Sequence, residues 1–134
     1  MDKQKLSSLL DEMGTFLDLL GENPFKVRAH QNAARIIETF QGDLEKSIAD
    51  GSIGEVKGIG PALKEKIEEF YRDGKITEYE KLKAKIAPGL LEMMQIQGLG
   101  PKRVRIIHEK LHVSSVGELE YACRENRLLK LDGF

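Results

Sequence analysis

Residues 56–67 decide the fold of this chain and read Val56-Lys57-Gly58-Ile59-Gly60-Pro61-Ala62-Leu63-Lys64-Glu65-Lys66-Ile67. An apolar residue and a spacer precede a Gly-apolar-Gly-Pro sequence, and a helical stretch follows. The same order returns at residues 96–107, which read Ile96-Gln97-Gly98-Leu99-Gly100-Pro101-Lys102-Arg103-Val104-Arg105-Ile106-Ile107. A third start, Leu131-Asp132-Gly133-Phe134, stands at the end of the sequence. The chain is therefore organised around a repeated turn that opens a helix.

Each copy of the turn is expected to expose the start of a helix. Two glycines around one apolar residue permit a tight turn, because glycine tolerates positive φ and close backbone approach. Ile59 and Leu99 are expected to fill the space between the flanking helices. Proline at the first helical position costs little, since its missing N–H would have no partner inside the helix. The remaining N–H groups and the helix dipole favour an anion, usually phosphate. Two turns that only cap helices, without a ligand, are the alternative interpretation.

Length and composition indicate one domain or two small ones. The chain has 134 residues, of which 40% are hydrophobic and 32% charged, as in ordinary globular proteins. Its single cysteine, Cys123, excludes an internal disulfide and offers no metal-binding set, so no side-chain metal site is expected. The first residues lack the apolar core of a signal peptide, and no apolar run reaches membrane-spanning length. We therefore expect a cytoplasmic protein without a membrane partner.

The charges are distributed unevenly along the chain. The net charge is only −1, but residues 1–55 carry a balance of −4 and residues 56–134 a balance of +3. Lys102, Arg103 and Arg105 cluster where the second repeat opens its helix. Such a basic spot suits phosphate binding. A solvated helix end is the alternative explanation.

The periodicity of the chain predicts helices throughout. Apolar residues three and four apart predict a first helix that Asp2 caps and Gly21 ends, and Asn23-Pro24 predicts the start of a second. Thr77 with Glu80, and Ser115 with Glu118, have the spacing of capping boxes that open later helices. No alternating strand pattern is present, so the predicted fold is all-α. The Pro88-Gly89 break predicts two helical lobes, residues 1–87 and 88–134.

The second helix also carries candidate phosphate ligands. Lys26 and His30 are four residues apart, so a helix places them on one face, where two donors could bind a phosphate. Taken alone, however, each of these side chains is better interpreted as a solvated one.

The repeated turn resembles the helix-hairpin-helix motif, which binds the nucleic-acid backbone without reading bases. Together with the segments around it, nearly the whole chain resembles the N-terminal region of family X DNA polymerases, in particular the bacterial and archaeal PolX type. The segments that carry this resemblance are Asn23-Pro24-Phe25-Lys26-Val27-Arg28-Ala29-His30, Ala33-Ala34-Arg35-Ile36-Ile37, the first hairpin, Asp73-Gly74-Lys75, Pro88-Gly89-Leu90-Leu91-Glu92-Met93-Met94 and the second hairpin. The series of motifs is specific, whereas a single hairpin would not be.

The resemblance implies a module that binds gapped or nicked DNA in repair, such as base excision repair. It places Lys26 and His30 among ligands of the 5′-phosphate and Lys66 at the position of a Schiff-base lysine that removes 5′-deoxyribose phosphate. It also implies a K⁺ or Na⁺ ion at backbone carbonyls of the two hairpins, those of Val56, Gly58, Ile96 and Gly98. The DNA-binding positions that follow are Gly58, Gly60, Ala62, Lys64, Gly98, Gly100, Lys102, Arg103 and Arg105.

Several positions depart from the lyase members of that family. Phe25 replaces a histidine, Ala62 replaces a phosphate-binding lysine, and Asn32 and Glu78 replace basic residues. From the sequence, Lys66 is expected to be a solvated lysine whose pKa the nearby Glu65 and Glu69 raise, which does not favour a nucleophile.

Three hypotheses therefore stay open. They are a non-catalytic DNA-binding module of a family X polymerase, the same module with lyase activity, and a hairpin scaffold that binds protein. The polymerase palm is not among these residues. The end inside a third hairpin suggests a piece of a longer polymerase chain, and a short stand-alone protein is the alternative.

Overall fold

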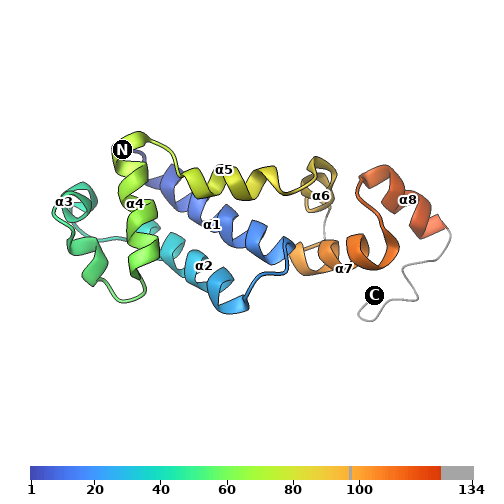
Figure 1. Ribbon diagram of the computed structural model, residues 1–134, viewed down its shortest axis with the longest axis horizontal. Helices are drawn as coiled ribbons and strands as arrows, with labels where there is room; N and C mark the ends of the chain where they lie inside the picture. The colour runs from blue at the N-terminus through green and yellow to red at the C-terminus, as the bar shows by residue number, and fades with distance from the viewer. Residues whose placement is uncertain (97, 125–134) are drawn as a thin grey trace.

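The computed structural model describes residues 1–96 and 98–124. In that part of the chain it contains helices only (Figure 1), namely α1 (Lys3–Leu19), α2 (Pro24–Glu38), α3 (Leu44–Ala49), the 3₁₀ helix η1 (Ser52–Glu55), α4 (Pro61–Asp73), α5 (Thr77–Ala84), α6 (Pro88–Met93), α7 (Pro101–Leu111) and α8 (Val116–Arg124). The all-α prediction is confirmed. None of these helices is long and apolar enough to cross a membrane. The predicted third hairpin start, at residues 131–134, lies outside the described residues.

Helices α1 and α2 form the centre of the first lobe. The side chain of Asp2 accepts a hydrogen bond from the Lys5 N–H at the start of α1, and Asn23 accepts one from the Phe25 N–H at the start of α2. The two helices approach closely at Gly14, where an added Cβ would lie 2.9 Å from Cγ of Gln31. Their apolar faces are buried together, and the residues on these faces include Leu6, Leu10, Met13, Leu17, Val27, Ala33, Ala34 and Ile37.

Helix α5 packs along α1 and completes this lobe (Figure 1). The rings of Phe16 and Tyr79 lie 5.5 Å apart between centroids, and the Tyr79 hydroxyl donates a hydrogen bond to Glu12. A buried phenol needs such a partner, because an unpaired hydroxyl in the core is costly. This contact fixes the position of α5 beside α1.

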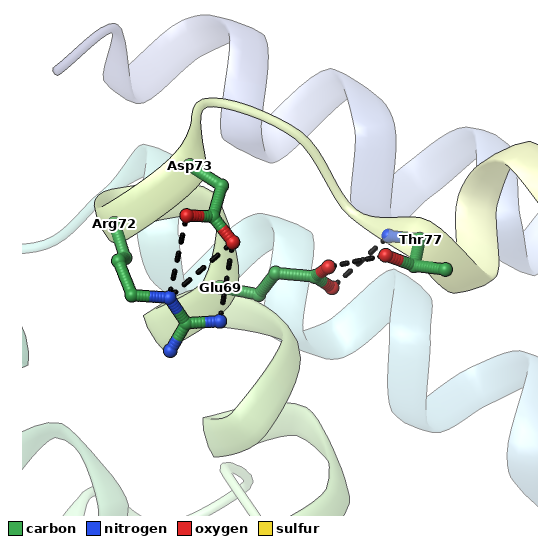
Figure 2. Close-up of polar contacts among 4 residues, drawn as sticks. All are labelled: Glu69, Arg72, Asp73 and Thr77. Atoms are coloured by element: carbon green, nitrogen blue, oxygen red, sulfur yellow. Dashed lines mark hydrogen bonds and ion pairs between the residues drawn. The ribbon is translucent and has the colours of Figure 1, made fainter.

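The start of α5 is capped by a residue from α4 rather than by the predicted Thr77–Glu80 box. Figure 2 shows the carboxylate of Glu69 accepting hydrogen bonds from both the N–H and the hydroxyl of Thr77. Thr77 is the first residue of α5, so it is itself a donor that needs a partner. Hydrogen bonds from Thr77 lower the pKa of the Glu69 carboxyl. The prediction of a Thr77–Glu80 capping box was wrong, because Glu69 of α4 is the group that accepts the hydrogen bonds of Thr77.

Helices α6, α7 and α8 form the other end of the molecule, opposite α3 (Figure 1). Pro88, expected to follow the end of a helix, does so after α5 ends at Ala84, and it opens α6 at the first position, where proline is tolerated. At the start of α8, Ser115 accepts a hydrogen bond from the Glu118 N–H, and Glu118 accepts one from the Ser114 N–H. Helix α7 also packs against α1, so the two predicted lobes are in contact.

Candidate nucleic-acid interface

The first hairpin joins η1 to α4 through the predicted glycine turn. Gly58 has a φ of +100°, and the Ile59 N–H donates to the Val56 carbonyl over 3.0 Å. Only glycine fits well here, because an added Cβ would lie 2.7 Å from the Ile36 side chain. Ile59 is buried as expected. No side chain caps the start of α4 after Gly60, so its first N–H groups are open to a ligand.

A cavity of ≈ 640 Å³ lies at this hairpin, a volume within the usual range for ligand pockets. Helix α2 supplies Lys26, Ala29 and His30, α4 supplies its first turn and Lys66, and residues 56–60 supply the turn itself. The structure therefore brings together most of the predicted residues of this region, namely Lys26, His30, Gly58, Gly60, Ala62 and Lys66.

Lys64 is the exception among the predicted residues of the first hairpin. It does not line the cavity, because its stem lies over η1, where an added Cβ on Gly54 would stand 2.7 Å from Cδ of Lys64. Its predicted contact with DNA therefore stays a prediction, and the structure gives its methylenes a packing role.

His30 forms the wall of the cavity rather than a solvated surface. It is 3% exposed, its Nδ1 lies 2.8 Å from the Lys26 carbonyl oxygen, and its Nε2 has no hydrogen-bond partner. Burial lowers the pKa of the imidazole, although the hydrogen bond to the Lys26 carbonyl opposes this shift. Burial therefore favours the neutral form of the ring.

Lys66 differs from its sequence-based description. It is partly buried, and burial lowers the pKa of its ammonium group. Glu78 and Glu65 act in the opposite direction, while the charge of Lys26 lowers the pKa further. The expectation of a solvated lysine with a raised pKa was wrong, because the folded chain partly buries Lys66 and places Lys26 of α2 near it.

The second hairpin repeats the turn of the first. Gly98 has a φ of +87°, and the Leu99 N–H donates to the Ile96 carbonyl over 3.1 Å. Leu99 is only partly buried, in contrast to Ile59. Gly100 precedes Pro101 at the start of α7, again without a side-chain cap.

The basic side chains at the second hairpin have different surroundings. Lys102 and Arg103 are exposed, and the Arg103 guanidinium donates to the Gly98 carbonyl over 2.9 Å. The Gly98 carbonyl is one of the predicted ligands of a K⁺ or Na⁺ ion, and it already accepts a hydrogen bond from a positively charged group. The ion sites at both hairpins stay predictions.

Arg105 faces the first lobe instead of the surface beside Lys102. Its Nη1 donates to the Asp18 carbonyl over 2.7 Å and lies 3.6 Å from the Asp18 carboxylate, and both side chains are largely buried, at 26% and 17% exposure. The interpretation of Arg105 as a phosphate ligand overlooked this contact, because only the packing of α7 on α1 reveals it. The arginine joins the two lobes.

Replacing Arg105 by Ala is expected to weaken the contact between the lobes. The change removes a charge-assisted hydrogen bond and leaves the Asp18 carboxylate partly buried, so we expect a loss of about 1–3 kcal/mol in the free energy of unfolding. Urea denaturation measures this loss, with the exposed Lys102→Ala on the same helix as control. An Arg105→Ala variant as stable as that control would contradict the structural role.

Two features of the interface escaped the sequence reasoning. Lys57 lines the cavity from within the turn, and its place between Val56 and Gly58 was a usable signal. Phe25, which precedes the cavity residue Lys26 in the chain, is 74% exposed, and the Arg28 guanidinium carbon lies 4.8 Å from the centroid of its ring. Nothing in the sequence distinguished this aromatic residue from a core residue, since only the fold shows which side of α2 is exposed.

Comparison with known proteins agrees with the geometry. The family described as "Helix-hairpin-helix domain" matches residues 1–76, and the family described as "SAM-like Helix-hairpin-helix tandem" matches residues 90–134. The chain is also 31% identical over all of its 134 residues to the DNA polymerase/3'-5' exonuclease PolX of Bacillus subtilis, of which it spans 23%. With two hairpins of the same geometry and these matches, the chain belongs to the helix-hairpin-helix family.

Proposed function

We propose that this chain binds gapped or nicked duplex DNA through its backbone and seats the 5′-phosphate of the gap in the cavity at the first hairpin. The observation that carries the proposal is the convergence of Lys26, Lys66 and the uncapped start of α4 on that one cavity. Two ammonium groups and a helix N-terminus supply charge and N–H donors, the groups that a phosphate monoester needs. A gap is preferred because it presents such a phosphate at a chain end.

The second hairpin contacts another part of the DNA backbone. Its uncapped helix start offers the N–H groups after Gly98 and Gly100, and the exposed Lys102 and Arg103 add positive charge. Such contacts read no base edges, so the binding has little sequence preference. An isolated module of this kind binds at about micromolar affinity or weaker at physiological salt, and the affinity falls as salt rises.

The wider context of this activity is a repair polymerase. The relative from Bacillus subtilis is named as a polymerase and exonuclease. By analogy, the polymerising chemistry would come from the remainder of a polymerase chain, acting on the DNA that this module holds. Domain boundaries at residues 1–87 and 88–134, and a cytoplasmic location, are part of the same proposal.

Removal of 5′-deoxyribose phosphate is the second candidate function. It is favoured by the partly buried Lys66, whose pKa burial lowers, in the wall of the same cavity. A neutral lysine attacks the C1′ aldehyde of the abasic sugar, and loss of water gives a Schiff base. Trapping with borohydride on a 5′-abasic DNA end tests this step, with Lys66→Ala as the variant that must lose the product and Lys64→Ala as the control.

Fluorescence anisotropy tests the main proposal with an intact duplex, a nicked duplex and a one-nucleotide gap that carries a 5′-phosphate. We expect the tightest binding to the phosphorylated gap, with affinities that fall steeply between two salt concentrations. Equal and weak binding to all three DNAs would leave only general backbone binding. Absence of binding at low salt, together with a stable oligomer of the chain, would instead favour the protein-binding scaffold.

A further inference from the structure

The tautomer of His30 is fixed by its own helix. The Lys26 carbonyl oxygen can only accept a hydrogen bond, so the Nδ1 atom that lies 2.8 Å from it must carry the hydrogen. In the neutral imidazole, Nε2 is then a bare acceptor. This atom is buried without a partner in a ring that lines the phosphate cavity.

A bare acceptor is the wrong partner for a phosphate dianion. All three terminal oxygens of the dianion are acceptors as well, so one hydrogen must lie between Nε2 and the nearest oxygen before the two can bond. The other groups named in this cavity, Lys26, Lys66 and the start of α4, are donors. His30 is therefore the group whose hydrogen-bonding state must change when the phosphate arrives.

We propose that the cavity takes up one proton together with the 5′-phosphate, and that this proton is shared between Nε2 of His30 and a phosphate oxygen. The inference rests on the proposed function. The proton comes from solvent, no covalent bond of the DNA breaks, and the bound state is either an imidazolium beside a dianion or a neutral imidazole beside a monoanion. Nε2 is covered in the free protein, so the phosphate reaches it as the neighbouring side chains rearrange.

The charges around the ring explain why the proton arrives only with the ligand. Burial acts most strongly against a positive charge on His30, and Lys66 on α4 and Lys26 on α2 act in the same direction. The hydrogen bond to the Lys26 carbonyl and, more weakly, Glu78 on α5 favour that charge. On the side of α1, a Cβ added to Gly14 would lie 3.6 Å from Cβ of His30, and Gly14 carries no charge. A phosphate with two negative charges reverses this balance, because it neutralises the lysines and attracts the proton.

Calorimetry on the full chain counts the proton directly. Binding of a one-nucleotide gap is measured at pH 7.5 in two buffers of different ionisation enthalpy, once with a 5′-phosphate and once with a 5′-hydroxyl. We expect an additional uptake of about one proton for the phosphorylated DNA. The second pKa of the 5′-phosphate is about 6, so the free phosphate is mainly a dianion at pH 7.5 and must gain the shared proton on binding. The affinity gained from the phosphate should accordingly fall about tenfold per pH unit above pH 7.

Two variants assign the proton to His30. His30→Gln carries an amide that donates by itself, so it should keep the preference for the phosphate and lose the proton uptake. Lys66→Arg keeps a permanent charge and should retain the uptake. Loss of the uptake in Lys66→Arg would overturn the assignment in favour of that lysine.

The wild-type measurement separates the two proposals without any variant. A preference for the phosphorylated gap without additional proton uptake overturns the role of His30 and leaves the phosphate seat intact. If the 5′-phosphate adds no affinity at either pH 6 or pH 8, the proposed phosphate seat fails, and the coupled proton fails with it.

Discussion

A chain that carries both Lys26→Gln and Lys66→Gln is expected to lose about 100-fold in affinity for the phosphorylated gap and almost nothing for the gap with a 5′-hydroxyl. Hydrogen bonds to charged groups contribute about 1.5–3 kcal/mol each. Lys26 is exposed and Lys66 partly buried, so we take the lower end of that range for each, which is about tenfold per lysine. The loss concerns the phosphate alone because both side chains line the cavity.

The control for this prediction removes two charges elsewhere. Lys75→Gln with Lys85→Gln changes the net charge by the same amount at exposed positions outside the cavity. Anisotropy at one fixed salt concentration compares the two double variants, because general electrostatic attraction depends on salt. If both double variants lose the same affinity for both DNAs, the lysines act through net charge and the cavity is not a phosphate seat.

The local features of this interface could be predicted from the sequence. Each hairpin is specified by residues that are adjacent in the chain, since Gly58 and Gly98 adopt positive φ and Pro61 and Pro101 open the next helix. The helical periodicity likewise depends on spacing within one element. These local patterns predict a turn or a helix whatever other elements pack against it.

The electrostatic state of the site could not be predicted in the same way. The sequence did not reveal that His30 is buried, and it predicted a raised pKa for Lys66, yet burial lowers the pKa of both side chains. The burial of these side chains depends on how α2 lies against the hairpin and α4. These elements are far apart in the sequence. The contact of Arg105 with Asp18 was missed for the same reason.

Gly89→Ala is expected to destabilise the second hairpin lobe by about 3 kcal/mol, at the upper end of the usual cost of overpacking. An added Cβ would overlap the Ser114 carbonyl oxygen and lie 2.9 Å from the Ser114 carbonyl carbon and 3.1 Å from Cα of Ser115. These are backbone atoms in the segment between α7 and α8, so no side-chain rotation relieves the overlap. Helix α6 must therefore move away from that segment.

The position of the damage makes this prediction specific. Hydrogen exchange should become faster in α6, α7 and α8, while the amides of α1 and α2 stay protected, because the overlap lies within the second lobe. Gly117→Ala is the matched control, since an added Cβ there meets no atom within 4 Å and alanine favours helix α8. Equal stability of the two variants would mean that α6 does not pack on the Ser114 backbone.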